Sequence, residues 1–84
     1  MKFDEIKNGD NFIFIKGTAY KANKINPEGI FDGLRQVNKN TKVTITKMTV
    51  IDSFGGERKR IFFKVKDDNC WMKWGDFKTM CERI

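Results

Sequence analysis

The chain has 84 residues, a formal net charge of +6, a hydrophobic content of 39% and an aromatic content of 13%. This length fits one domain with a thin core, and the aromatic content is sufficient to build that core, which argues against extensive disorder. The excess of 17 Lys and Arg over 11 Asp and Glu favours an anionic partner: nucleic acid, a membrane surface or an acidic protein. We expect residues 1–84 to form a single domain.

Membrane insertion and secretion are not expected. No hydrophobic run approaches the roughly 18 residues that a membrane span requires, and residues 1–5 lack the apolar core of a signal peptide. We therefore predict a cytoplasmic protein with no membrane partner. In that compartment Cys70 and Cys81 are expected to be free thiols.

The residue types argue against an enzyme. The chain has no histidine, which removes the commonest general base, and two cysteines without histidine do not complete a four-ligand zinc site. Gly55 and Gly56 are followed by Glu57, which repels phosphate, so they do not form a phosphate-binding loop. The adjacent carboxylates Asp67 and Asp68 are typical of a solvated turn. We expect no catalytic residue, no metal and no cofactor.

Two strands open the predicted sheet. Residues 11–16 contain a continuous apolar run of Phe and Ile, which is too short for a helix and predicts the central strand. A tight turn at residues 17–18 leads to a second strand at residues 19–25. Residues 26–29 predict a turn, because Pro27 presets φ and the final glycine can take a positive φ.

The next two strands each contain an irregularity. Residues 30–37 predict a weaker strand, in which Gly33 indicates a bulge or a sharp bend. A polar turn at residues 38–40 leads to a long strand at residues 42–51. The apolar residues of that strand change parity along its length, and a bulge near Lys47 would reconcile them.

A hairpin and a helix complete the chain. The glycines at residues 55–56 close a hairpin into a strand at residues 58–66, and a turn at residues 67–69 leads to a last short strand at residues 70–73. From Asp76, which is a plausible N-cap, the period changes to that of a helix. Its expected apolar face is Trp74, Phe77, Cys81 and Ile84, with Trp74 in the core.

Several short strands followed by one helix predict a mainly β fold: a small barrel or a curved antiparallel sheet, with one short C-terminal helix.

The opening of the chain follows the pattern Phe3-x-x-Ile6-x-x-Gly9-Asp10-x-Phe12-x-Phe14-x-x-Gly17-x-x-Tyr20. This pattern covers about a quarter of the chain and resembles the start of small SH3-like barrels common in bacteriophage genomes. Size, charge and opening are also similar to short early proteins of T-even-type phages, a group that includes an RNA-binding antagonist of a toxin–antitoxin ribonuclease. The resemblance implies an SH3-like barrel. It further implies a phage factor in the host bacterial cytoplasm, with RNA and a host toxin ribonuclease as partners.

The strand at residues 58–66 separates apolar from cationic side chains. Alternation places Ile61, Phe63 and Val65 on one face and Arg58, Arg60, Phe62, Lys64 and Lys66 on the other. Same-face residues lie about 6.6–7 Å apart, close to the phosphate spacing of an extended nucleic-acid strand. The cations can therefore follow a backbone while Phe62 stacks on an unpaired base. The predicted nucleic-acid-binding residues are Arg58, Arg60, Phe62, Lys64, Lys66, Lys47 and Trp71.

Two alternatives remain open. The cationic face can be a solvated surface that keeps sheets from pairing edge to edge, with Phe62 packed under the terminal helix or a loop. A small basic domain can also act as a protein–protein inhibitor, binding an acidic or nucleic-acid-binding host protein directly.

Overall fold

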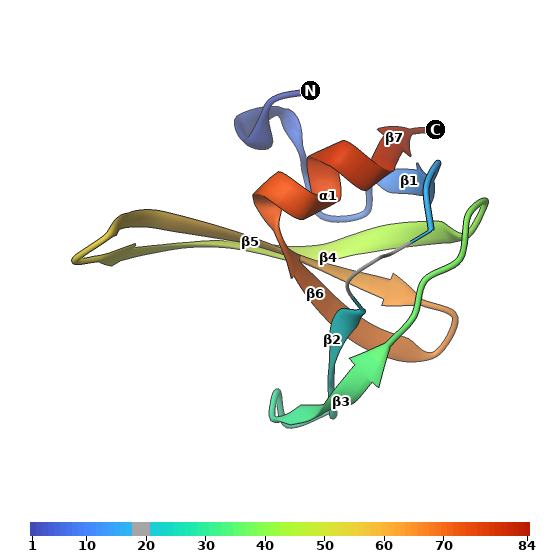
Figure 1. Cartoon of the computed structure of the whole chain (residues 1–84), viewed down its shortest axis with the longest axis horizontal. Coiled ribbons are helices and arrows are strands. Elements are labelled where there is room, and N and C mark those ends of the chain that lie inside the picture. The colour runs from blue at the N-terminus through green and yellow to red at the C-terminus, as the bar shows by residue number, and fades with distance from the viewer. Residues whose placement is uncertain (18–20) are drawn as a thin grey trace.

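The computed structural model describes residues 1–17 and 21–84 and shows a curved antiparallel sheet with a short helix packed on one face (Figure 1). Helices and strands follow the chain as η1 (Phe3–Glu5), β1 (Asn11–Phe14), β2 (Ala22–Ile25), β3 (Phe31–Arg35), β4 (Lys42–Ser53), β5 (Gly56–Val65), β6 (Asp68–Lys73), α1 (Trp74–Met80) and β7 (Cys81–Arg83). The predicted mainly β fold is confirmed, in its curved-sheet form.

The strand order is β3-β2-β6-β5-β4-β1-β7, so β5 is the central strand of the sheet that the described residues form. The prediction that the first strand is central is wrong, because β1 lies between β4 and β7. Phe12 and Phe14 of β1 are nevertheless fully buried. The aromatic run of β1 therefore reflects packing beneath α1 rather than a central position.

The hydrophobic core lies between α1 and the sheet. Phe77 of α1 lies 5.2 Å from Phe12 and 5.6 Å from Phe63, measured between ring centroids. On β5, Ile61, Phe63 and Val65 are at most 1% exposed. The predicted alternation is confirmed for residues 58–65, and the apolar face of this strand packs against the core.

Two predicted irregularities are confirmed. The β4–β5 register shifts between Ile45 and Lys47, which is the bulge expected near Lys47. The β2–β3 register shifts where Gly33 adopts a φ of 96°, a left-handed conformation that favours glycine. The first bulge reverses the parity of β4, so that residues on both sides of it keep apolar side chains toward the core.

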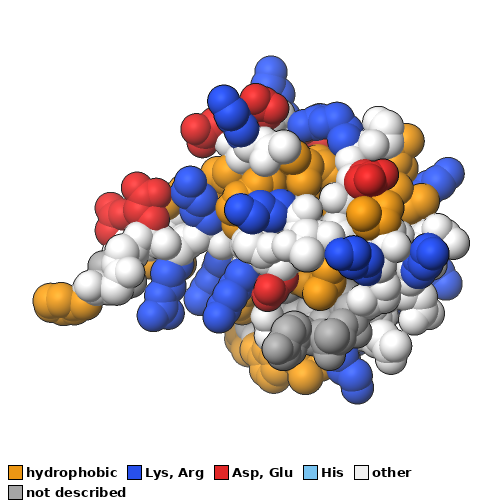
Figure 2. Space-filling view, turned by 45° about the horizontal axis from the view of Figure 1, so that its top comes forward, with side chains coloured by type: hydrophobic (Ala, Val, Ile, Leu, Met, Phe, Trp, Pro, Cys, Tyr) orange, Lys and Arg blue, Asp and Glu red, His pale blue; other side chains and the backbone are white. Residues whose placement is uncertain are grey.

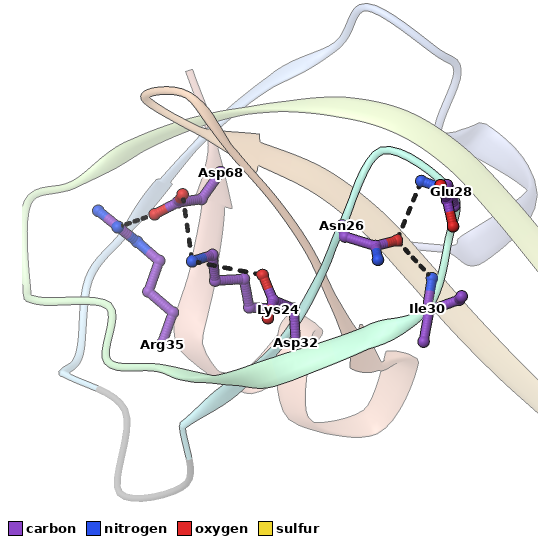
Figure 3. A network of polar contacts seen from close by, with 7 residues as sticks. All are labelled: Lys24, Asn26, Glu28, Ile30, Asp32, Arg35 and Asp68. Atoms are coloured by element: carbon purple, nitrogen blue, oxygen red, sulfur yellow. Dashed lines mark hydrogen bonds and ion pairs between the residues drawn. The ribbon is translucent and has the colours of Figure 1, made fainter.

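Polar contacts fix the β2–β3 hairpin. The predicted turn at residues 26–29 is present: the Asn26 side-chain oxygen accepts hydrogen bonds from the backbone N–H groups of Glu28 and Ile30 (Figure 3). Asp68 at the start of β6 pairs with Arg35 of β3 and with Lys24 of β2. These ion pairs join three neighbouring strands at one end of the sheet.

The predicted turn at residues 17–18 and the beginning of the predicted second strand overlap residues 18–20, which lie outside the described residues. Within the described ranges, no helix is long and apolar enough to cross a membrane.

The C-terminal helix is shorter than predicted. It begins at Trp74 and ends at Met80, its N-cap is Lys73, and Asp76 lies inside the first turn, so the prediction of Asp76 as N-cap is wrong. Cys81 starts β7 and pairs with Phe14 of β1. The predicted helical face that includes Cys81 and Ile84 is therefore wrong, because β1 offers backbone partners that end the helix. Trp74 packs against the core as predicted.

Lys66 lies in the two-residue turn between β5 and β6 rather than in a strand, and its φ of 54° is left-handed. Left-handed backbone is unfavourable for a residue with a Cβ atom. We expect Lys66→Gly to raise the free energy of unfolding by about 0.5–1 kcal/mol in urea denaturation. Lys64→Gly, inside the strand, is the control and should lower it by a similar amount. A Lys66→Gly protein less stable than the parent would contradict the prediction.

Both cysteines are free thiols, as predicted, and the structure shows that both are buried. Burial raises the pKa of Cys70 to about 11 and the pKa of Cys81 further still. We expect the native thiols to react with a disulfide reagent at about pH 8 at least a hundredfold more slowly than the thiols of the urea-unfolded chain. The pKa of each thiol is higher in the folded chain than in the unfolded chain. The stabilisation that comes from keeping these thiols protonated is therefore complete below the unfolded pKa, and it is lost as the pH rises above about 9. Equal rates of thiol reaction in the native and the urea-unfolded chain would contradict the prediction.

Candidate nucleic-acid interface

The face of the central strands that is turned away from α1 carries most of the predicted site. It is built on β4, β5 and β6, which are neighbours in the sheet. Because Ile61, Phe63 and Val65 point into the core, the intervening residues of β5 point outward. We call this surface the basic face, and its residues are Lys47, Arg58, Arg60, Phe62, Lys64, Trp71 and Lys73.

Two aromatic rings occupy the middle of the basic face. The register places Lys47, Phe62 and Trp71 in one row across β4, β5 and β6. The rings of Phe62 and Trp71 lie 6.2 Å apart with an interplanar angle of 36°, and Lys47 Nζ lies 5.3 Å from the centre of the Phe62 ring. The sequence did not reveal that Trp71 and Lys47 would meet at Phe62, because their proximity depends on strand order.

Phe62 is half-buried by these neighbours and not by the helix. The interpretation that the terminal helix covers Phe62 is wrong, since Phe77 of α1 contacts Phe63 on the opposite face. The edge of the Phe62–Trp71 pair therefore remains accessible on the outer surface of the sheet.

A second row lies beside the first. Arg60 stands opposite Thr49 on β4 and Lys73 on β6, and its guanidinium carbon lies 4.2 Å from the centre of the Trp71 ring. A guanidinium that lies over an indole offers a second flat surface, on which a base can stack. Lys73 was missed by the sequence analysis, although its spacing of two residues from Trp71 was the available signal.

The remaining predicted residues lie toward the ends of the basic face. Arg58 and Lys64 are exposed and lie on β5 on either side of the aromatic pair. Lys64 stands opposite Asn69, a half-buried amide that adds hydrogen-bonding capacity. Lys66 lies beyond the face, in the turn that follows β5. The structure thus brings six of the seven predicted residues onto one surface and adds Lys73.

The cations of the basic face are not neutralised by carboxylates. Across residues 1–17 and 21–84, the ion pairs involve Lys24, Arg35 and Arg83 and no member of the basic face. The carboxylates that do pair lie elsewhere; Asp10, for example, accepts from the Lys7 backbone N–H and from Arg83, and these contacts lower its pKa. The positive charge of the basic face is therefore available to an anionic ligand.

Protection of sheet edges does not account for this charge. Cations that block edge-to-edge pairing belong on edge strands. The edge strands of the described sheet are β3 and β7, whereas the basic face lies on its three middle strands. The position of these cations on the middle strands therefore does not fit the edge-protection interpretation.

A groove continues from the basic face around the end of β6. It has a volume of about 510 Å³ and is lined by Glu57, Arg58, Lys59 and Arg60 of β5 together with residues 73–76. Trp74 forms part of its wall. Its walls combine the cations Arg58, Lys59, Arg60 and Lys73 with the carboxylates Glu57 and Asp76.

No family model, curated protein or solved structure matches the chain. Within residues 1–17 and 21–84, no group of three or more Cys, Asp and Glu residues is placed to hold a metal ion. The basic face itself offers cationic side chains and two aromatic rings, with the Asn69 amide opposite Lys64.

Proposed function

We propose that the protein binds single-stranded nucleic acid, with RNA loops as the preferred ligand, through the basic face. One observation carries this proposal: the contact pair Phe62–Trp71 lies among cations that have no carboxylate partner in the described structure, at the centre of the sheet. A solvated surface needs charge but does not need two adjacent aromatic rings. A ligand with phosphates and flat bases needs both.

The geometry suggests how such a ligand lies. Arg58, Arg60 and Lys64 share one side of β5 at spacings of about 6.6–7 Å, or twice that where Phe62 intervenes, and can follow successive phosphates. A base opposite Phe62 would stack on the Phe62–Trp71 pair, with a free energy of about 1–3 kcal/mol per base. The strands are rigid elements, so little conformational entropy is lost when the ligand binds.

Paired bases cannot reach these rings, which is why the proposal specifies unpaired strands. In a duplex each base is stacked on both sides, and an aromatic side chain gains access only after unstacking. Asn69 beside Lys64 can hydrogen-bond a base edge or a sugar hydroxyl, which supports RNA as the preferred ligand.

The proposal is tested by titrating the protein into labelled RNA of about twelve nucleotides and following fluorescence polarisation and tryptophan quenching. We expect the single strand to bind at least tenfold more tightly than a duplex of the same sequence. With three phosphate contacts, from Arg58, Arg60 and Lys64, the logarithm of the binding constant should fall against the logarithm of salt with a slope of about −2.1. Equal affinity for duplex and single strand, or no binding at about 50 mM salt, would refute the proposal.

The resemblance of the opening to phage proteins is the basis for a wider proposal. In it, RNA binding serves a phage factor that counteracts a host defence such as a toxin ribonuclease in the bacterial cytoplasm. Complex formation between purified protein and such a ribonuclease, lost when the basic face is mutated, is the expected result.

A second candidate function is direct inhibition of a host protein. It is favoured by the apolar surface of the β3 hairpin, where Ile30, Phe31 and Leu34 are 57–60% exposed. Exposed apolar side chains grouped on an edge strand are typical of protein interfaces. A stoichiometric complex that survives nuclease treatment and is lost in Phe31→Ser would support this function over RNA binding.

A further inference from the structure

The hairpin of β4 and β5 extends well beyond the body of the protein (Figure 1). Pairing with β1 ends at Thr44 of β4, and pairing with β6 ends at Arg60 of β5. The β4–β5 register continues past these residues to the pair formed by Ser53 and Gly56. We call residues 50–59 the arm.

The arm has two chemically different sides. Cross-strand register places Arg58 opposite Ile51 on the side continuous with the basic face. It places Glu57 opposite Asp52 on the other side. Figure 2 shows the acidic side chains of the projecting hairpin gathered on one side, with cations both beside them and on the opposite side. Lys59, opposite Val50, belongs to the side of the carboxylates. An anionic strand on the basic face can therefore continue along the arm without meeting these carboxylates.

Phe54 forms the tip of the arm with Gly55. The relative exposure of Phe54 is 114%, so its ring is not buried against the described part of the chain. Figure 2 shows the hydrophobic end of the projecting hairpin. Turns normally carry Gly, Asn, Asp or Ser, and burying a phenyl group is worth about 1.5–3 kcal/mol. An aromatic ring at this position has no structural role in the described chain and is free to meet a ligand.

We propose that Phe54 is a second stacking point for the same strand that the basic face binds; this inference rests on the proposed function. Phe62 lies eight positions after Phe54, and because Phe54 and Gly55 form the turn before β5, the backbone between them spans at most about 26 Å. A stretched nucleic acid covers that distance in about four nucleotides. Arg58 lies between the two rings and holds an intervening phosphate. The ligand is thus an unpaired segment of about six nucleotides or more, read at both ends by aromatic rings.

The experiment compares single-stranded RNAs of about four, eight and twelve nucleotides on the parent protein and on Phe54→Ala. Because the ring contacts nothing in the fold, the variant should keep the parent's unfolding midpoint. We expect Phe54→Ala to weaken binding of the longer RNAs about 5- to 100-fold and to leave the shortest RNA unaffected. The matched control is Val50→Ala, because Val50 is an exposed apolar residue on the other side of the arm. This substitution should change neither the unfolding midpoint nor the affinity for RNA.

A second substitution separates stacking from simple apolar contact. Phe54→Trp should retain the affinity for long RNA and add a tryptophan signal that the ligand quenches. Phe54→Leu, in contrast, should bind as weakly as Phe54→Ala. Full affinity in Phe54→Leu would overturn the stacking role.

The failures of the two proposals are distinguishable. If Phe54→Ala binds long RNA as tightly as the parent while Phe62→Ala does not, the arm does not touch the strand and this inference is overturned, but the proposed function stands. In that case, the expected binding site for Phe54 would be a pocket on a partner protein. If the parent binds no RNA at any length, both proposals fail.

Discussion

Replacing Arg58 and Lys64 by Glu is expected to remove most of the affinity for single-stranded RNA. Both side chains are exposed on the basic face and neither is in an ion pair of the described structure, so the substitutions should leave folding intact. Loss of two phosphate contacts should reduce the salt slope by about 1.4 and the affinity by more than tenfold at about 100 mM salt. Polarisation titrations at several salt concentrations measure both quantities.

The matched control reverses two cations on the other side of the sheet. Lys78 lies on α1, and Lys2 precedes Phe3, whose ring lies 5.5 Å from Trp74. Replacing both by Glu lowers the net charge by the same amount as the test variant. The control should bind RNA within about threefold of the parent, because neither cation belongs to the basic face and the exposed charges are screened by salt. If both variants lose affinity equally, bulk charge rather than the basic face binds the ligand.

Replacing Phe63 by Ala is expected to have the largest effect on stability. The ring is fully buried and lies 5.9 Å from the ring of Phe14 and 5.6 Å from that of Phe77. Such truncations cost about 3–5 kcal/mol, whereas a domain of this length has a total stability of roughly 4–12 kcal/mol. We expect a large fall in the urea midpoint, measured by circular dichroism.

The neighbouring residue provides the comparison. Phe62→Ala removes a half-buried ring from the opposite face and should lower the free energy of unfolding by only about 1 kcal/mol. It should nevertheless weaken RNA binding by about 5- to 100-fold. The two substitutions thus separate the two faces of one strand. Similar losses of stability in both variants would show that Phe62 is a core residue and would remove the main support for the basic face.

Local rules explain what could be predicted. The period of two residues placed Phe63 in the core and Phe62 outside it, because alternation in a strand is fixed by backbone geometry. The parity change in β4 located the bulge near Lys47 for the same reason. Gly33 indicated the irregularity in the pairing of its strand because a positive φ is costly for residues other than glycine.

Strand pairing between distant segments explains why the predicted helix end and the predicted central strand were wrong. The spacing of Trp74, Phe77, Cys81 and Ile84 suits a helix, and local sequence contains nothing that forbids it. The helix ends at Met80 because the edge of β1 offers Cys81 and the residues after it a strand partner. The central position of β5 likewise depends on which strands pair, and pairing is not a local property.

The sequence by itself determined the separation of apolar and cationic side chains along residues 58–65, the mainly β fold and the excess of positive charge. Only the tertiary structure decided that Trp71 and Lys47 meet at Phe62, that Lys73 joins them, and that an arm carries Phe54 away from the body. The physical reason is that side-chain direction follows from the backbone of one strand. Proximity across strands follows from the order and register in which the whole chain pairs.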